Sequence, residues 1–171
     1  MRIAILSDSH DHIPNLNRAV LLANREGAEV LLHCGDLISP FMLKYLNRYH
    51  GPVHLIYGNN AGDQHLIASR CATVYDNLHH HGQHAGFHVG SYRIALNHYP
   101  ELARPLAQSG LFDLVCCGHN HIHAVERFGQ TLLINPGDLL GKDAAPGFVL
   151  LDTGSGKIER LQAGNQLIMD E

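Results

Sequence analysis

The chain alternates between short apolar runs and small polar clusters, and the first apolar run covers residues 3–6. Four consecutive apolar residues that include two isoleucines are typical of a strand buried on both faces of a parallel sheet. The run stops at a polar segment, residues 7–12, which holds Asp8 and His10. Open α/β sheets bind ligands beyond the carboxyl ends of their strands. We therefore predict a central strand that delivers Asp8 and His10 to a site.

The same pattern returns twice in the first third of the chain. Apolar residues at helical spacing follow Pro14 and end before Gly27, which predicts a helix between these two residues. Residues 30–34 and 53–57 predict two further strands, with a second helix after Pro40. These strands end at Asp36 and at Asn59-Asn60, so successive βα units each place polar side chains just past a strand end.

Hairpins dominate the rest of the chain. We predict hairpins from residues 87–89 with 92–96, 124–128 with 131–134, and 148–151 with 158–161. A short helix over 102–106, a buried strand over 111–117 and a loop at 135–137 complete the pattern. Parallel units followed by hairpins indicate an α/β fold in which two mixed sheets form a sandwich with flanking helices. No linker or repeat divides the chain, so we expect one domain over residues 1–171.

Composition narrows the class of protein. The chain is 45% hydrophobic and 16% charged, and its formal net charge is −4, with no basic cluster that would indicate a nucleic-acid footprint. Its apolar runs are far shorter than the roughly 20 residues of a membrane-spanning helix, so we expect no membrane span, and we also expect no signal peptide. Two of the four cysteines sit in apolar runs, so we expect buried thiols, no disulfides and a cytoplasmic location.

The polar residues at the strand ends are of the types that bind metal ions. They comprise two carboxylates, one amide and four imidazoles, namely Asp8, His10, Asp36, Asn59, His98, His119 and His121. This mixture of nitrogen and oxygen donors suits Mn, Fe, Zn, Ni or Co, and there are enough donors for two divalent ions. Two such ions and two aspartates leave a charge of about +2, which would attract an anionic substrate.

A simpler interpretation exists for each candidate taken alone. Aspartate and asparagine favour turns and helix caps without any chemistry. The metal hypothesis depends on all seven residues converging. The histidine-rich stretch over 79–88 could be a second metal site, but its spacing with Gly82 and Gly86 favours a solvated loop. His33, His54 and His123 are more typical of packed or edge residues than of ligands.

The strand-end motifs resemble, in order and spacing, those of the calcineurin-like metallophosphoesterases. They are Asp8-Ser9-His10, Gly35-Asp36, Gly58-Asn59, His98 and Gly118-His119-Asn120-His121. The resemblance covers residues 8–137, and Tyr57-Gly58-Asn59-Asn60 and Asn135-Pro136-Gly137 look most like the small YfcE-like phosphodiesterases. It implies a four-layer fold and the hydrolysis of a small phosphate ester.

The resemblance also implies a partition of the ligands between two ions, with manganese first among the candidates. Asp8, His10 and His121 would hold one ion, Asn59, His98 and His119 the other, and Asp36 would bridge them. In this family such a pair of ions supplies the attacking hydroxide and clamps the phosphate oxygens. Asp36, Asn59 and His98 would take part in catalysis as well as in metal binding, and Asn60 would belong to the catalytic residues without binding metal.

One position departs from the pattern of many relatives. They carry a histidine after the motif asparagine, thought to protonate the leaving group, whereas this chain has Asn60. The small branch commonly lacks that histidine too. We expect either a preference for good leaving groups or another proton donor, such as His12 or His65. Asp138 stands where relatives often have a small hydroxyl residue, and its contact with the site stays open.

Two other functions remain compatible with the sequence. The same ligands would serve a phosphomonoesterase or nucleotidase, which the motifs do not separate from a phosphodiesterase. A subunit of retromer has a similar fold and acts as a binding scaffold with a degraded site. No ligand position is missing here, which favours an enzyme. Relatives often form dimers, so the resemblance allows a homo-oligomer.

Overall fold

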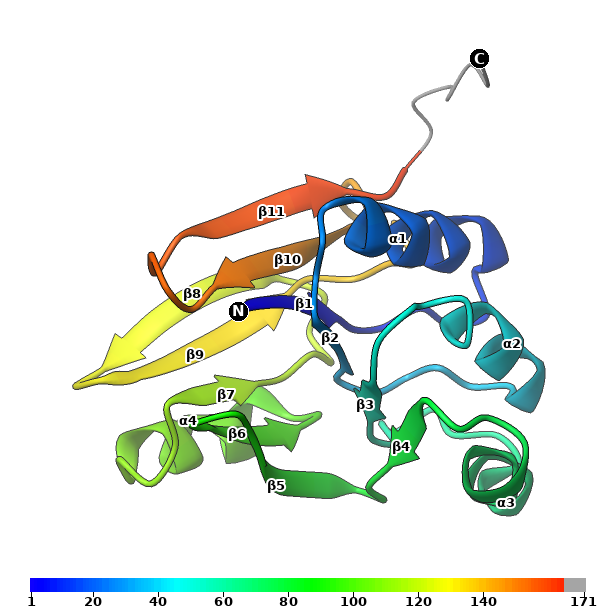
Figure 1. The fold of residues 1–171 in the computed structure, drawn as a ribbon, viewed down its shortest axis with the longest axis horizontal. Helices are drawn as coiled ribbons and strands as arrows, with labels where there is room; N and C mark the ends of the chain where they lie inside the picture. Colours follow the sequence, from blue (N-terminus) through cyan, green and yellow to red (C-terminus); the bar gives the residue numbers. More distant parts are fainter. Residues whose placement is uncertain (165–171) are drawn as a thin grey trace.

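The computed structural model describes residues 1–164, and two β-sheets packed face to face make up its centre (Figure 1). The larger sheet has six strands. In spatial order they are β11 (Ile158–Gln162), β10 (Gly147–Asp152), β1 (Arg2–Leu6), β2 (Val30–His33), β3 (Val53–Leu55) and β4 (Leu78–His80). Strands β1 to β4 are parallel, whereas β10 and β11 are antiparallel to their neighbours. Strand β1 therefore lies inside the sheet, as its apolar run predicted.

The smaller sheet has five strands and is also mixed. Their spatial order is β5 (His84–Val89), β6 (Tyr92–Asn97), β7 (Leu114–Cys116), β9 (Thr131–Pro136) and β8 (His123–Phe128). Strands β6, β7 and β9 run parallel, and the hairpin partners β5 and β8 form antiparallel edges. All three predicted hairpins are thus present in the two sheets.

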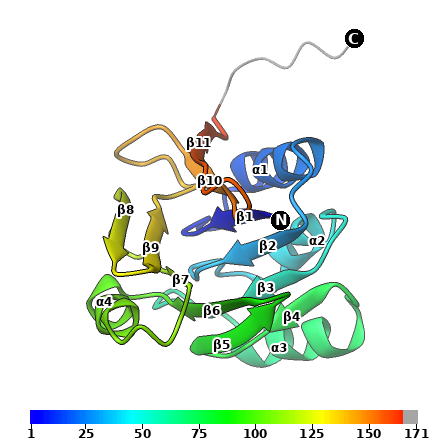
Figure 2. The same ribbon diagram turned by 60° about the vertical axis from the view of Figure 1, so that its left-hand side comes forward.

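Helices cover the outer faces of both sheets. Helices α1 (Ile13–Arg25), α2 (Leu43–Leu46) and α3 (Gln64–Thr73), with the 3-10 turn η1 (Pro40–Met42), pack on the larger sheet. Helix α4 (Pro100–Gln108) packs on the smaller one, on the opposite side of the molecule (Figures 1 and 2). The result is a four-layer α/β sandwich, which confirms the predicted fold class. Among residues 1–164, no helix is both long and apolar enough to cross a bilayer.

Strand β1 shows why its sequence has no polar alternation. Ile3 and Ile5 pack into the layer between the two sheets, with side chains from β2, β7, β9 and β10. Ala4 and Leu6 point the other way, into the layer beneath the helices. Because both faces of the strand are covered, every position must be apolar, and all four residues are fully buried.

The histidine-rich stretch is not the solvated loop that its composition predicted. Its two ends form the edge strands β4 and β5, joined by a short turn. Strand β4 pairs with β3, so that His54 lies opposite His79. The His54 ring stacks on Phe87 at 4.2 Å, and its Nδ1 lies 2.9 Å from Nε2 of His81. Strand pairing and ring contacts therefore override the weak strand preference of histidine and glycine.

Several element boundaries also differ from the prediction, two of them in strands that lead to the site. The predicted strand over residues 111–117 is shorter, because only Leu114–Cys116 join the sheet as β7. Conversely, Asn135 and Pro136 belong to the end of β9 rather than to a loop. Proline is tolerated there because β9 is ending, and the chain turns at Gly137, whose φ is 80°.

The layer between α1 and the larger sheet should dominate the stability of the fold. Phe148 on β10 is fully buried in it. We expect Phe148→Ala to lower the free energy of unfolding by about 3–5 kcal/mol, measured by urea denaturation, because the truncation leaves a cavity. Leu111→Ala, at a side chain that is 65% exposed, is the control and should change it by less than about 0.5 kcal/mol. Equal losses in the two variants would contradict this assignment of the core.

Candidate metal centre

Loops from both sheets meet at the carboxyl ends of their parallel strands. The loop after β1 binds the loop after β2 through two backbone hydrogen bonds, from Asp8 N to Gly35 O and from His10 N to Asp36 O, both 3.0 Å. The loop after β7 joins them, because His119 N donates to Asp8 Oδ2 at 3.0 Å. Three segments far apart in sequence are thus held together by hydrogen bonds within the chain.

The backbone of these loops adopts an unusual conformation. In the part of the chain that the structure describes, seven non-glycine residues have φ between 42° and 76°. Five of them are predicted metal ligands, namely Asp8, His10, Asp36, His119 and His121. Left-handed backbone is uncommon outside glycine, and it persists where the surrounding structure holds it in place. The loops are therefore shaped to direct these side chains.

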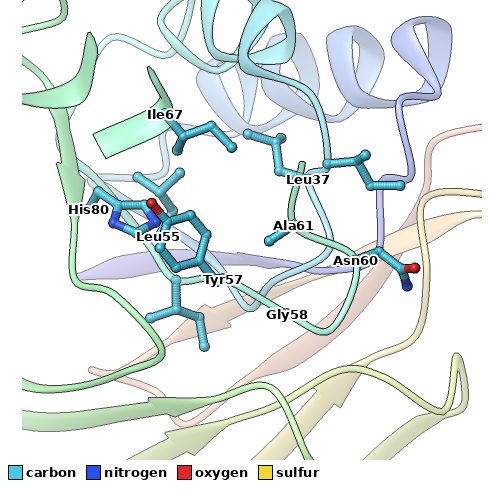
Figure 3. A pocket seen from close by; sticks show the side chains of 10 residues that line it. Leu37, Leu55, Tyr57, Gly58, Asn60, Ala61, Ile67 and His80 are labelled. Carbon is cyan, nitrogen blue, oxygen red and sulfur yellow. The ribbon is translucent and has the colours of Figure 1, made fainter. Parts of the chain in front are cut away.

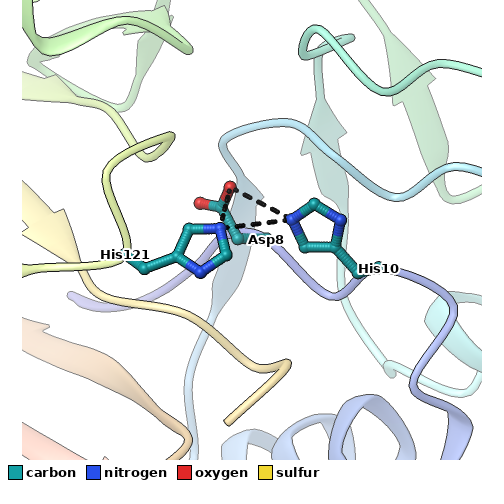
Figure 4. Close-up of side chains that lie close together, drawn as sticks. All are labelled: Asp8, His10 and His121. Atoms are coloured by element: carbon teal, nitrogen blue, oxygen red, sulfur yellow. Dashed lines mark hydrogen bonds and ion pairs between the residues drawn. The ribbon is translucent and has the colours of Figure 1, made fainter. Parts of the chain in front are cut away.

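The first group of donors consists of Asp8, His10 and His121 (Figure 4). Asp8 Oδ1 lies 3.7 Å from Nε2 of His10 and 3.4 Å from Nε2 of His121, and the two Nε2 atoms are 3.3 Å apart. Figure 4 shows the carboxylate between the two rings. Asp8 is fully buried, and its Oδ1 has no hydrogen-bond partner. An orphaned carboxylate oxygen facing two imidazole nitrogens fits a divalent transition-metal cation.

The second group gathers around Asn59. Asn59 Oδ1 lies 3.0 Å from Nε2 of His98 and 2.8 Å from Nδ1 of His119. The other nitrogen of His98, Nδ1, lies 2.8 Å from the carbonyl oxygen of Cys34. A carbonyl can only accept, so Nδ1 donates its hydrogen there and Nε2 keeps its lone pair toward the site.

Asp36 lies between the two groups. Its Oδ2 is 3.5 Å from Nε2 of His10, and its Oδ1 is 3.5 Å from Nε2 of His98. Asp8, Asp36 and His98 also form a set whose ligand atoms all lie within 4.8 Å of one another. All seven residues that the sequence singled out are therefore brought together, and Asp36 is the one that contacts both groups.

The electrostatic interactions within the first group of donors favour the binding of a cation. Burial alone would raise the pKa of the Asp8 carboxyl, but its interactions with His10, the His98 ring and the His119 backbone N–H leave the pKa lowered. The Asp8 carboxylate in turn raises the pKa of the His10 imidazole, against the opposing effect of partial burial. The aspartate stays ionised, and a cation that displaced the His10 proton would take its place beside the carboxylate.

Asn60 is an exposed residue whose backbone and side chain both bind Asp36. Its backbone N–H donates to Asp36 Oδ1 at 2.8 Å, and its side-chain amide donates to Oδ2 at 2.7 Å. A cavity of about 10 Å³ lies next to it, lined mainly by apolar side chains (Figure 3). Figure 3 shows the Asn60 side chain pointing away from that cavity, which has room for about one water molecule.

The two residues suggested as alternative proton donors, His12 and His65, both lie at the start of a helix. His12 caps α1, because its Nδ1 accepts a hydrogen bond from the Asn15 backbone N–H at 3.3 Å. His65 is an exposed residue in the first turn of α3. His123, in contrast, behaves as the predicted strand residue, with its Nδ1 3.1 Å from Asn135 O.

Three residues around the site were not predicted as part of it. Asp138 is 1% exposed and lies 3.3 Å from Nδ1 of His121. Asn135 donates from its amide to Gly118 O at 2.8 Å, which holds the turn that carries His119 and His121. The Tyr99 ring packs edge-on against both His98 and His119. The signals for Asn135 and Asp138 were the Asn-Pro-Gly segment, which resembles the small branch of the family, and the departure from that pattern at Asp138. Tyr99 gave none beyond its place next to His98.

Comparisons with known proteins identify the family and the fold of the chain. The model of a family described as the calcineurin-like phosphoesterase superfamily domain matches residues 1–156. A phosphodiesterase of Methanocaldococcus jannaschii is 31% identical over 167 residues, which cover 90% of this chain and 93% of the relative. The solved structure of an archaeal phosphodiesterase superposes with a TM-score of 0.87 at 28% identity, over 95% of this chain and 99% of that one. The phosphoesterase YfcE of E. coli shares the fold, with a TM-score of 0.69 at 19% identity over 96% and 100% of the two chains.

The backbone at Gly58 lies so close to Asp36 that no side chain fits between them, and a substitution there tests whether this close approach matters for metal binding. A Cβ atom on Gly58 would lie 2.0 Å from Asp36 Oδ1 and 2.7 Å from Asp36 N. We expect Gly58→Ala to displace the carboxylate and to weaken Mn²⁺ binding by at least about 10-fold in isothermal titration calorimetry. Gly86→Ala is the control, because its Cβ would meet only Phe112 at an ordinary 3.5 Å. Unchanged Mn²⁺ binding in Gly58→Ala would contradict the prediction, because it would show that metal binding does not depend on the position of the Asp36 carboxylate beside Gly58.

His33 should make the metal-free fold sensitive to acid. The ring is fully buried against Ser9 Oγ, and burial lowers the pKa of His33 from 6.5 to about 4. Below pH 6.5 the unfolded chain takes up a proton that the folded chain refuses until about pH 4, so stability falls over that range. Between about pH 7 and about pH 5, the free energy of unfolding should fall by about 2 kcal/mol less in His33→Gln than in wild type. Urea denaturation of chelator-treated protein measures this difference. The matched change at exposed His50 should leave the slope unaltered, and parallel curves for His33→Gln and wild type would contradict the assignment.

Proposed function

The chain belongs to the calcineurin-like phosphoesterase superfamily and is a hydrolase of phosphoric esters, and we propose that it cleaves a small phosphodiester with the help of two divalent cations. The observation that carries this proposal is the position of Asp36 between two groups of metal-binding side chains. The relatives named phosphodiesterases favour a diester over a monoester as the substrate.

We propose that the two groups of donors each hold one cation. Asp8, His10 and His121 would bind the first, and Asn59, His98 and His119 the second. Asp36, which lies between the two groups, would contribute to both sites. The donors are oxygen and imidazole atoms without thiolates, which suits manganese and, next to it, Fe, Zn, Ni or Co.

Bound divalent cations supply two things to such a reaction, a water molecule of lowered pKa as nucleophile and polarisation of the phosphate oxygens. The side chains set the geometry in which this happens. The hydrogen bond from His98 Nδ1 to Cys34 O aims its Nε2 inward, and both amide donors of Asn60 fix the two oxygens of Asp36. Two cations with charge +4 and two aspartates with charge −2 leave the site at +2, which attracts a phosphate anion.

We also propose that the site lacks a strong general acid for the leaving group. The position after Asn59 carries Asn60, whose amide already donates to Asp36. The capping bond to Nδ1 fixes the ring of His12 at the start of α1. The enzyme should therefore prefer esters whose leaving group needs no protonation, such as nitrophenolates.

The contacts in the site favour an enzyme over a binding scaffold of the same fold. A binding scaffold would not require seven potential metal ligands to lie in two groups. Nor would it require left-handed backbone at five of these ligands. The four cysteines are free and buried, which supports the proposal of a cytoplasmic location.

The test is hydrolysis of bis-p-nitrophenyl phosphate by chelator-stripped protein supplied with Mn²⁺ or Ni²⁺. Activity should appear with metal and disappear with EDTA. Asp36→Asn should reduce kcat/KM by more than about 100-fold, because changes outside the ligand shell alone commonly cost 10–100-fold. Asp76→Asn removes the same charge from an exposed aspartate and should leave the rate unchanged.

Inactivity with every metal tested would reject the proposed function. Faster hydrolysis of p-nitrophenyl phosphate than of the diester would reject the diester preference and leave a phosphomonoesterase. A metal-free protein that forms a stable complex with another protein would instead support the scaffold.

A further inference from the structure

A buried carboxylate lies behind the first group of donors and belongs to neither ligand set. Asp138 is 1% exposed, and its Oδ2 lies 3.3 Å from Nδ1 of His121. The same oxygen accepts a hydrogen bond from the Gly141 backbone N–H at 2.9 Å. Burying an ionised carboxylate is unfavourable unless it interacts with donors or charges, so the contact with His121 needs a reason.

We propose that Asp138 is a positioning residue that holds the His121 imidazole in the orientation and tautomer needed to bind the first cation. This inference rests on the proposed function, because it assumes that Asp8, His10 and His121 hold a cation. It adds a residue that acts through His121 and does not itself reach the cation.

The segment that carries Asp138 is tied to the loop that carries Asp8. The backbone N–H groups of Leu139 and Leu140 both donate to Asp8 O, at 3.2 and 3.0 Å. Asn15 donates from its amide to Leu139 O at 2.7 Å, which adds a bond to the start of α1. The Asp138 carboxylate therefore has a fixed position relative to Asp8, and it can set the direction of the His121 ring between them.

The two nitrogens of His121 face different neighbours. Nδ1 faces the Asp138 carboxylate, whereas Nε2 faces Asp8 Oδ1 and Nε2 of His10. A neutral imidazole carries one hydrogen, and either carboxylate could accept it. If Asp138 accepts it from Nδ1, Nε2 is left with its lone pair toward the cation, and the negative charge behind the ring makes that lone pair more basic. Without Asp138, Asp8 would favour the hydrogen on Nε2, where it blocks the metal.

The direct test is binding of Mn²⁺ to chelator-stripped protein by isothermal titration calorimetry. Asp138→Asn keeps an oxygen that can accept from Gly141 N–H but loses the charge. We expect it to weaken one of the two binding events by about 10–100-fold and to leave the other within about twofold. Asp113→Asn is the matched control, because that carboxylate also accepts from a backbone N–H, of Arg93, but lies in the ion pair with Arg93.

A double-mutant comparison separates positioning from a general structural effect. In a His121→Ala background, Asp138→Asn should change Mn²⁺ affinity by less than about twofold, since the residue through which it acts is gone. A second measurement uses the wild-type protein alone, namely the imidazole nitrogen chemical shifts of His121 by NMR in the metal-free state. They should report hydrogen on Nδ1.

The outcomes separate this inference from the proposed function. Wild type that binds two Mn²⁺ ions while Asp138→Asn binds them equally well would overturn the inference and leave the function standing. An equal loss with and without His121, or a wild-type His121 with its hydrogen on Nε2, would overturn it too. Wild type that binds no Mn²⁺ would overturn the metal site and this inference with it. The expected coupling in a protein without phosphoesterase activity would support the inference and reject the function.

Discussion

Two almost completely buried aspartates, Asp8 and Asp36, impose the constraint on which the site depends. Neither carboxylate forms an ion pair with lysine or arginine among residues 1–164, and each is surrounded by imidazoles and hydrogen-bond donors. Transferring a carboxylate from water into a protein is strongly unfavourable unless charges or donors replace the water. Backbone N–H groups of His119 and Asn60 replace part of it. Asp8 Oδ1 still has no hydrogen-bond partner, and a cation would supply what is missing.

The rest of the fold supplies the rigidity that such a site requires. The layer between the sheets and the layer beneath the helices are apolar and closely packed, so the ends of β1, β2 and β7 cannot move independently. The loops beyond them can then hold left-handed backbone at Asp8, Asp36 and His121. Left-handed backbone at each such residue costs about 1–3 kcal/mol and is kept only where the surrounding structure determines it. The stability of the core thus allows the loops at the carboxyl ends of the strands to keep an unfavourable backbone conformation.

Much of this arrangement could be predicted from the sequence, and the failures have physical causes. Apolar runs fixed the place of β1 and β2 because their residues are covered on both faces, and ligands at strand ends followed from the direction of the strands. Strand β4 and the first residues of β5 were missed. Strand β4 is stabilised by pairing with β3, and the turn after it by the ring of Phe87, and these are tertiary contacts. Asp138 was left open because its role depends on His121, which is distant in sequence and comes close only through the fold.

A change at His121 and a change at Asp36 should affect different parts of the site. His121 belongs to the first group of donors, and Asn59 contacts both histidines of the second group. Asp36 contacts both, and the Asn60 backbone and side chain bind its two oxygens at once, so the carboxylate cannot rotate toward one group without losing a bond to Asn60. A disturbance at His121 should therefore remain local, whereas one at Asp36 must reach both halves. In this view Asn60 keeps the Asp36 carboxylate in place between the two groups, which is a reason for an asparagine at this position that does not depend on proton transfer.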